Sequence, residues 1–194
     1  MDAPTPSVRP GPVTLEGRLA RLEPLALHHL DDLAVAGADP AVWDWLFEPY
    51  LTRDALRPWL EAALATAATG SEVPFATIDR ATGRAVGSSR FMSIAHEHRR
   101  LEIGWTWLGT AAQGTGINTE AKLLQLTHAF EVLGYRRVEF KTDALNGRSR
   151  AALAGLGATF EGVFRKHMLM ANGRSRDSAW YRSEEHTSEL QSRG

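Results

Sequence analysis

The strongest chemical signal in this 194-residue sequence is a segment with two glycines that precedes its longest predicted helix. The segment reads Gln113, Gly114, Thr115, Gly116, Ile117, Asn118, Thr119 and Glu120. Glycine lets a ligand approach the backbone closely, and the first N–H groups of a helix have no acceptor within it. Together with the positive end of the helix dipole, these N–H groups form an anion site that suits a pyrophosphate. The alternative is a turn that only joins a strand to a helix.

Two common phosphate-binding motifs do not fit this segment. A nucleotide P-loop has a lysine after its second glycine, whereas Gly116 is followed by Ile117. The dinucleotide fingerprint has a third glycine, which is absent here. We therefore expect a phosphate site of a different type at the start of this helix.

The composition excludes several other classes of function. The formal net charge is -1, from 22 basic and 23 acidic residues, so no nucleic acid is implied as a partner. Cysteine is absent, which excludes a disulfide framework, a thiolate metal site and a cysteine nucleophile. His96, Glu97 and His98 could suggest metal ligands, but we place them in a turn and expect no metal. No run of about 18 apolar residues predicts a membrane span, so a cytoplasmic protein is expected.

The two ends of the chain are predicted to lie outside the folded domain. Residues 1–11 carry Pro4, Pro6 and Pro10 and are expected to form a disordered leader. Residues 12–182 are expected to form a single domain. Residues 183–194 look like the translation of a common sequencing-adapter oligonucleotide. We therefore expect the native C-terminus to be missing from about Arg182 onward.

Between these ends, strand-like and helix-like runs alternate, which indicates a mixed sheet with helices on both faces. Helices are predicted over His28–Ala36, Thr52–Thr69, Thr115–Leu133 and Asn146–Leu156. Strands are predicted over Val13–Leu25 (as one strand or a bent pair), Phe75–Ile78, Ala85–Ile94, Leu101–Leu108, Arg136–Thr142, Ala158–His167 and Asp177–Tyr181.

Two of these elements have patterns that predict which side chains share a face. The long helix carries one apolar stripe, which we expect to face the core, formed by Leu123, Leu126, Phe130 and Leu133. In the central strand, strict alternation predicts one face with Leu101, Ile103, Trp105 and Trp107, and an opposite face with Glu102, Gly104 and Thr106.

Several motifs in order resemble the GNAT superfamily of acyltransferases. The family's phosphate loop, Q/R-x-x-G-x-G/A, is matched by Gln113 to Asn118, with Asn118 in place of the small last residue. The resemblance is closer to the RimJ/RimL-type branch, the ribosomal-protein N-terminal acetyltransferases. That branch's motifs appear as Glu102-Ile103-Gly104-Trp105, as Gly114 to Ala121, as Asn146-Gly147-Arg148-Ser149, and as Leu156-Gly157-Ala158. The resemblance covers roughly Val13 to Tyr181.

The resemblance implies both a fold and an activity. The expected fold is a mixed α/β domain whose twisted, mostly antiparallel sheet has six to seven strands. Two parallel neighbours, Leu101–Leu108 and Arg136–Thr142, would splay apart to admit the pantetheine arm. The implied activity is an N-acetyltransferase that moves the acetyl group of acetyl-CoA to a primary amine, by direct attack in a ternary complex. The amine would belong to a protein N-terminus or a small molecule, and the enzyme would be a monomer or a homodimer.

The resemblance also implies which residues bind acetyl-CoA. They are Trp107 and Leu108 through their backbone, the loop residues Gln113, Gly114, Thr115, Gly116, Ile117 and Asn118, and Asn146 and Ser149 at the start of a later helix. For the last two, a capping role is the alternative, because Asn and Ser commonly accept hydrogen bonds from the first N–H groups of a helix.

Two residues are candidates for catalysis. Glu102 lies in a central strand, where burial could raise the pKa of its carboxyl toward neutrality, and it is the candidate base. The alternative is a structural ion pair with an arginine such as Arg90. Glu161 is a second candidate base. Ser149 is the candidate acid or partner of the departing CoA thiolate.

Other conspicuous residues have a functional and a structural interpretation. The aromatic residues Trp43, Trp45, Phe47, Tyr50 and Trp59 could line the pocket of the amine or could pack in the core. The basic residues Arg136, Arg137, Arg148 and Arg150 could form a rim for the CoA 3′-phosphate or a solvated surface. Three functions stay open: an acyltransferase, a CoA-binding sensor without turnover, and an interaction domain without a CoA site.

Overall fold

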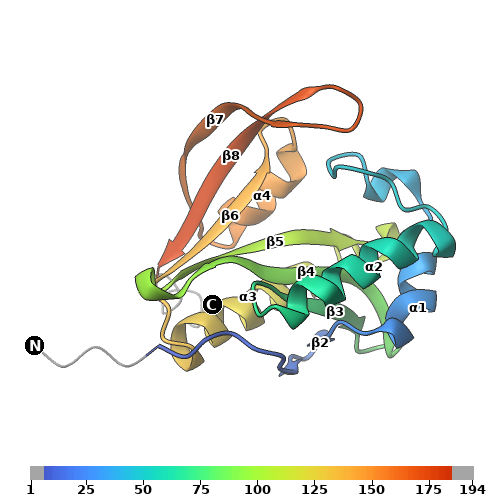
Figure 1. The fold of residues 1–194 in the computed structure, drawn as a ribbon, viewed down its shortest axis with the longest axis horizontal. Helices are drawn as coiled ribbons and strands as arrows, with labels where there is room; N and C mark the ends of the chain where they lie inside the picture. Colours follow the sequence, from blue (N-terminus) through green and yellow to red (C-terminus); the bar gives the residue numbers. More distant parts are fainter. Residues whose placement is uncertain (1–6, 185–194) are drawn as a thin grey trace, which may run out of the picture.

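The computed structural model describes residues 7–184, which form one sheet with helices on both faces (Figure 1). The strands of these residues are ordered β1-β2-β3-β4-β5-β6-β8-β7 across the sheet. They are β1 Leu15–Glu16, β2 Ala20–Pro24, β3 Val73–Asp79, β4 Arg84–Ala95, β5 Arg100–Leu108, β6 Arg137–Asp143, β7 Thr159–Leu169 and β8 Ser175–Glu184. The α-helices are α1 Leu30–Ala36, α2 Arg53–Ala68, α3 Ile117–Thr127 and α4 Gly147–Gly155.

The predicted splay between two parallel strands is confirmed. β5 and β6 are the parallel pair of this otherwise antiparallel sheet. They pair only at Arg100↔Arg137, Leu101↔Val138 and Glu102↔Glu139, and beyond Glu102 they separate into a V (Figure 1). The sheet has eight strands among the described residues instead of six to seven. The early region Val13–Leu25 contributes the bent pair β1 and β2.

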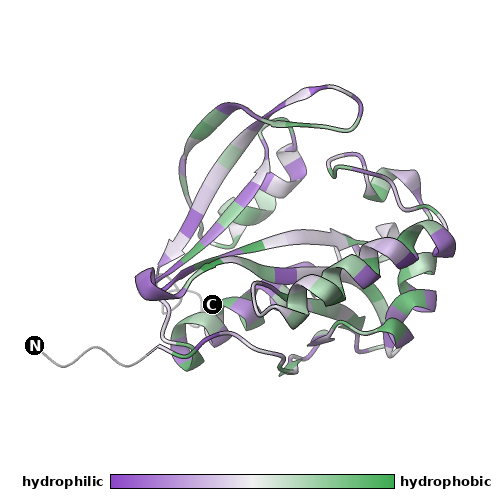
Figure 2. Ribbon diagram, in the orientation of Figure 1, coloured by the Kyte–Doolittle hydropathy of each residue, from purple (hydrophilic) through white to green (hydrophobic). Residues whose placement is uncertain are grey.

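Each face of the sheet has its own hydrophobic core. On one face, α3 and α4 pack through residues such as Leu126 and Leu153 against β2, β5, β6 and β8. On the other face, α1 and α2 pack through residues such as Leu33 and Leu60 against β3, β4 and β5. The helices carry both hydrophilic and hydrophobic residues (Figure 2), as expected when one side of each helix faces the sheet.

The long predicted helix has two parts. α3 ends at Thr127 and continues as a π-helical turn, His128–Val132, before Gly134 adopts a left-handed conformation. The predicted apolar stripe is confirmed: Leu126, Phe130 and Leu133 are buried, and Leu123 packs against the same core.

The predicted strict alternation along β5 is wrong, because this strand contains a β-bulge. Ser88 of β4 lies opposite Trp107, whereas Arg90 lies opposite Gly104, so β5 has one residue more than β4 in this interval. Trp105 lies in the bulge, with a left-handed φ of 49°. A bulge inserts one residue into a strand and thereby changes the face on which later side chains lie.

The bulge moves the two tryptophans of β5 away from the core under α3. Leu101 and Ile103 belong to that core, but Trp107 belongs to the core under α1 and α2, and Trp105 packs beside it. Thr106 turns the opposite way and accepts a hydrogen bond from Lys122 of α3. The bulge therefore brings indole rings to the side of the sheet on which Glu102 lies.

The predicted domain, residues 12–182, begins and ends within the described residues 7–184. The N–H of Val8, in the predicted leader, donates to the carbonyl of Leu133 at 2.9 Å. β8 continues through Ser183 and Glu184, which lie opposite Val138 and Arg137. The other residues of the predicted leader and tail, 1–6 and 185–194, lie outside the described residues. No helix within residues 7–184 has the length and apolar character needed to cross a membrane.

Candidate active site

The predicted phosphate loop leads into α3 in a conformation that leaves helix N–H groups available. Gly114 and Gly116 both have left-handed φ angles, 77° and 90°, which glycine adopts without strain. Gly116 precedes the first helical residue and has no side chain with which to cap the helix, while the Thr115 hydroxyl accepts a long hydrogen bond from the Ile117 N–H at 3.5 Å. The Thr115 hydroxyl donates to the carbonyl of Ala112 at 2.7 Å and so holds the loop. Within residues 7–184, the N–H of Asn118 finds no acceptor.

Glu120, in the first turn of α3, fixes the turn between β1 and β2 beside this loop. Its carboxylate accepts hydrogen bonds from the N–H groups of Arg18 and Ala20, at 3.0 and 2.6 Å, and from that of Leu19. Partial burial raises the pKa of Glu120, but these three bonds outweigh it and hold the pKa below its usual value. The Leu19 side chain consequently lies 3.1 Å from where a Cβ at position 116 would be.

Gln113 joins the end of β5 to the start of α4. Its amide nitrogen donates to the carbonyl of Leu108 at 2.8 Å, and its amide oxygen accepts a hydrogen bond from Arg148. The carbonyl of Leu108, which the sequence suggested as a backbone contact for pantetheine, is thus engaged by Gln113. The same bonds bring a guanidinium of α4 to the phosphate loop.

The edge of β5 that faces the splay lacks a strand partner beyond Glu102. The side chains of Trp107 and Leu108 are buried, so these residues can offer a ligand only their backbone. The Trp107 ring packs 4.9 Å from the Trp43 ring and 5.9 Å from the Trp59 ring, measured between centroids. The structural interpretation therefore holds for Trp43 and Trp59, which are core residues.

Phe47 is the aromatic residue of the α1–α2 segment that reaches across the splay. It is half-buried, and its ring centroid lies 5.7 Å from that of Trp105 in the bulge. On its other side, the guanidinium of Arg176 from β8 lies 5.8 Å from the ring centroid. Phe47 thus connects the two arms of the V.

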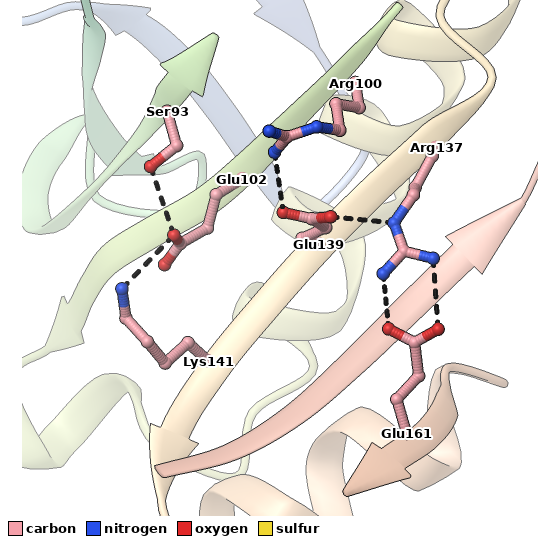
Figure 3. A network of polar contacts seen from close by, with 7 residues as sticks. All are labelled: Ser93, Arg100, Glu102, Arg137, Glu139, Lys141 and Glu161. Atoms are coloured by element: carbon pink, nitrogen blue, oxygen red, sulfur yellow. Dashed lines mark hydrogen bonds and ion pairs between the residues drawn. The ribbon is translucent and has the colours of Figure 1, made fainter. Parts of the chain in front are cut away.

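Glu102 is buried where β5 and β6 begin to separate, with 2% of its surface exposed (Figure 3). Its Oε2 accepts from the Lys141 Nζ of β6 and from the Ser93 hydroxyl of β4, each at 3.3 Å. Among the described residues, none donates to Oε1. The suggested ion pair between Glu102 and Arg90 is wrong. Arg90 pairs with Glu72 at 2.7 Å and lies over the rings of Trp59 and Trp105.

A network of ion pairs holds the closed end of the V together (Figure 3). Glu139 of β6 accepts from Arg100 of β5 at 3.3 Å and from the Nε of Arg137 at 2.7 Å. Arg137 also donates to Glu161 of β7, which Arg182 contacts as well. The bond from Arg137 lowers the pKa of Glu161, so this carboxylate is a weak proton acceptor. The geometry thus favours Glu102 over Glu161 as the base.

The predicted helix start at Asn146 is confirmed, and its capping role is visible. The Asn146 side-chain oxygen accepts from the N–H of Ser149 at 3.0 Å. The Ser149 hydroxyl makes no hydrogen bond within residues 7–184. Arg148 and Arg150, suggested as parts of one basic rim, point to different partners: Arg150 donates to the Tyr181 hydroxyl and to a backbone carbonyl.

Sequence reasoning missed a polar face that β6, β7 and β8 present on the Glu102 side of the sheet. Lys141 lies opposite Trp180 in the register, and its Nζ is 5.2 Å from the indole centroid. His167 of β7 is hydrogen-bonded to the Ser178 hydroxyl at 3.0 Å. Burial lowers the pKa of His167, and Lys141 lowers it further. These residues meet only through the pairing of three strands, so no local motif marks them.

His96, Glu97 and His98 lie in the predicted turn, a 3-10 turn between β4 and β5, and are not among the ligand-type groups that converge within residues 7–184. Within residues 7–184, the ligand-type groups that converge are Glu23, His28 and His29. His29 uses both ring nitrogens: Nδ1 accepts the Ala26 N–H at 3.1 Å, and Nε2 lies 3.1 Å from Glu23. Both ring nitrogens of His29 are therefore engaged by protein groups.

Comparison with known proteins decides the family. Residues 20–159 match the acetyltransferase (GNAT) domain family. The chain belongs to the GNAT acetyltransferase family. No curated protein matched the sequence. Among solved structures, a GCN5-related N-acetyltransferase from Brucella melitensis is 37% identical with a TM-score of 0.87, over 94% of this chain and 83% of that chain.

Two more distant structures share the fold. Mycobacterium smegmatis RimJ in complex with CoA-disulfide is 22% identical, with a TM-score of 0.79, over 94% of this chain and 96% of that chain. The ribosomal-protein-S5-alanine acetyltransferase from Vibrio fischeri is 17% identical, with a TM-score of 0.74, over 89% of this chain and 97% of that chain. The protein is thus a GNAT N-acetyltransferase with a RimJ-like fold, and its family uses acetyl-CoA.

Proposed function

We propose that the protein transfers the acetyl group of acetyl-CoA to a primary amine, by direct attack of the amine on the thioester in a ternary complex. The observation that carries this proposal is the splay of β5 from β6. It leaves an open strand edge with an uncapped helix N-terminus beyond one end and a buried carboxylate at the other. A long ligand with a phosphate at one end and a reacting group at the other suits this arrangement.

The donor would bind along this edge. Its pyrophosphate would accept hydrogen bonds from the first N–H groups of α3, with Asn118 and Thr115 beside them. Arg148, which already reaches Gln113, would add a positive charge near these phosphates. The pantetheine arm would then pair with β5 like an added strand, through backbone groups at Trp107.

The thioester would lie near the bulge of β5. A bulge disrupts the regular ladder and leaves backbone groups without strand partners. A backbone N–H there would polarise the thioester carbonyl and stabilise the oxyanion that forms on attack. Trp105, held in a left-handed conformation, is the residue that creates this break.

The acceptor amine must lose a proton, and Glu102 is the proposed base. Its Oε1 has no hydrogen-bond donor among the described residues, so it can accept a proton while Oε2 keeps Lys141 and Ser93. A base of this kind typically contributes about 10²–10⁴-fold to the rate. Ser149, whose hydroxyl is free in the first turn of α4, would donate a proton or a hydrogen bond to the departing CoA thiolate.

The acceptor is a primary amine on a small molecule or on a protein N-terminus. The name of the Vibrio fischeri structure, a ribosomal-protein-S5-alanine acetyltransferase, supports the N-terminal alternative. The alternative to catalysis is a GNAT-fold sensor that binds CoA without turnover. The free Oε1 of Glu102 favours catalysis over this sensor.

Release of the CoA thiol, measured with acetyl-CoA and a panel of primary amines and N-terminal peptides, tests the proposal. We expect release that depends on the amine, together with a product heavier by one acetyl group in mass spectrometry. Binding of acetyl-CoA with no acetylated product from any amine would instead establish the sensor.

A further inference from the structure

Arg176 of β8 is buried without a counterion. Only 5% of its surface is exposed, and its side chain forms neither a hydrogen bond nor an ion pair within the described part of the chain. Its Nε is completely buried and has no acceptor. Because a buried charge is costly unless it is paired, such an arginine indicates a site for an anion that arrives with a ligand.

The anions nearest to Arg176 have other partners. The Asp143 side chain is fully buried and accepts from Arg174 and from the N–H of Leu145. Glu102 accepts from Lys141 and Ser93. Burial lowers the pKa of Arg176, and the charges of Asp143 and Glu102 only oppose this effect from a distance. Arginine nevertheless stays protonated, so the guanidinium remains a cation.

Arg176 lies on the side of the sheet that carries Lys141 and Glu102. Arg176, Ser178 and Trp180 are spaced two residues apart along β8, so their side chains lie on the same face of the sheet. Lys141 of β6 also lies on this face. Its guanidinium rests against Phe47, whose ring in turn contacts Trp105 in the bulge. In Figure 1 the segment between α1 and α2 approaches the β7–β8 hairpin at this place.

Phe47 can uncover the guanidinium for a ligand. It lies outside any helix or strand, in the segment between the 3-10 turn Pro40–Val42 and the start of α2. The ring centroid lies 5.8 Å from the guanidinium, so a rotation of this half-buried ring would uncover Arg176 on the side of the sheet that carries Glu102. The planar guanidinium offers paired donors that match the two oxygens of a carboxylate.

We propose that Arg176 binds a carboxylate carried by the acceptor, so that the preferred substrates are amines that also bear a carboxylate. The inference rests on the proposed acetyl transfer and names its substrate class. Phe47 would cover the bound carboxylate, while the amine of the same molecule reaches Glu102. Phosphonates are also anions that can accept paired hydrogen bonds from a guanidinium, and they are included in the test.

Matched acceptors test this assignment. The rate constant kcat/KM for acetylation is measured for glycine, β-alanine and γ-aminobutyrate, for their carboxamides, and for aminomethylphosphonate. We expect kcat/KM for the best carboxylate to exceed that for its carboxamide by about tenfold or more. A factor of this size corresponds to the usual strength of a hydrogen bond to a charged group. Arg176→Gln should remove this preference, and a preferred phosphonate would assign a phosphonate ligand and overturn the carboxylate.

Arg174→Gln is the matched control, because Arg174 is on the same hairpin but is already paired with Asp143. It should keep the preference for carboxylates. Arg176→Met is a second variant of similar length, in case the amide variant does not fold, and the affinity for CoA reports folding of each. A preference that survives in both Arg176 variants, or that is absent from the wild type, overturns the assignment.

Binding is measured separately from turnover. γ-Aminobutyrate and its carboxamide are titrated calorimetrically into the protein saturated with CoA. Binding of the acid that requires Arg176, without acetylation of any amine, would refute acetyl transfer and retain the carboxylate site. Equal acetylation of acids and amides would retain acetyl transfer and refute the carboxylate site.

Discussion

Two buried ionisable residues, Glu102 and Lys122, have opposite environments, and replacing either one should have a measurable consequence. Glu102 faces a cation across the splay at 3.3 Å. Lys122 faces only neutral oxygens, those of Ser89 and Thr106 at 2.8 and 2.6 Å and that of Gln125 at 3.3 Å. The Glu102–Lys141 pair belongs to the proposed catalytic site. Lys122 instead lies on the opposite side of the sheet, where α3 packs against β4 and β5.

Replacing Glu102 with Gln should lower kcat by about a hundredfold, because the amide cannot accept the proton of the amine. The affinity for CoA should change little, since the carboxylate lies away from the phosphate loop. Steady-state kinetics and CoA titration on the folded variant provide both values. Glu139→Gln is the matched control: Glu139 lies opposite Glu102 in the register and also carries a buried carboxylate. A similar loss of kcat in both variants would remove Glu102 as the base.

Replacing Lys122 with Met should change how stability depends on pH. Burial lowers the pKa of Lys122 to about 7, whereas the pKa of this lysine in the unfolded chain is its ordinary value of 10.5. Between these values the unfolded state binds more protons, so the wild type gains stability as pH rises, by up to ~1.4 kcal/mol per pH unit. The variant should lack this gain between about pH 7 and 10. Urea unfolding at several pH values measures it, and parallel curves for the two proteins would contradict the buried neutral lysine.

At the scale of elements, the start of α3 is the feature that local sequence predicted best. Glycine positions and helix onset are local properties, and the structure has left-handed Gly114 and Gly116 directly before the helix. The bulge in β5 was not predictable in this way. It exists because one residue of β5 is extra relative to β4, and Trp105 carries no local mark of that mismatch.

Gly116→Val should abolish CoA binding. Valine is strained at a φ of 90°, and its Cβ would lie only 3.1 Å from the Leu19 side chain. The added side chain would also stand beside the helix N–H groups that would face the pyrophosphate. Affinity for CoA is the measurement. Gly155→Ala is the control, because Gly155 lies at the end of α4 with nothing within 4 Å of the added methyl group. Wild-type affinity in Gly116→Val would refute the phosphate loop.

At the scale of the whole molecule, the sheet is closed at one end and open at the other. The closed end is tied by the ion pairs of Glu139 and Glu161, and the open end is spanned by Gln113 and Arg148. The mixed sheet and the parallel, splayed pair were predictable, because the resemblance assigns them as a unit. The partner of Glu102 and the face around Arg176 were not, because they depend on which strands become neighbours.

Calorimetric titration of acetyl-CoA into the full chain, with adenosine diphosphate and desulfo-CoA as comparisons, tests the splayed cofactor site most directly. We expect saturable binding of acetyl-CoA that is clearly tighter than that of the diphosphate, because the pantetheine arm adds contacts along the open edge of β5. The affinity for desulfo-CoA should lie between those for the diphosphate and for acetyl-CoA, or should equal the affinity for acetyl-CoA. Equal affinity for acetyl-CoA and the diphosphate, or no binding by the folded protein, would contradict a pantetheine site between β5 and β6.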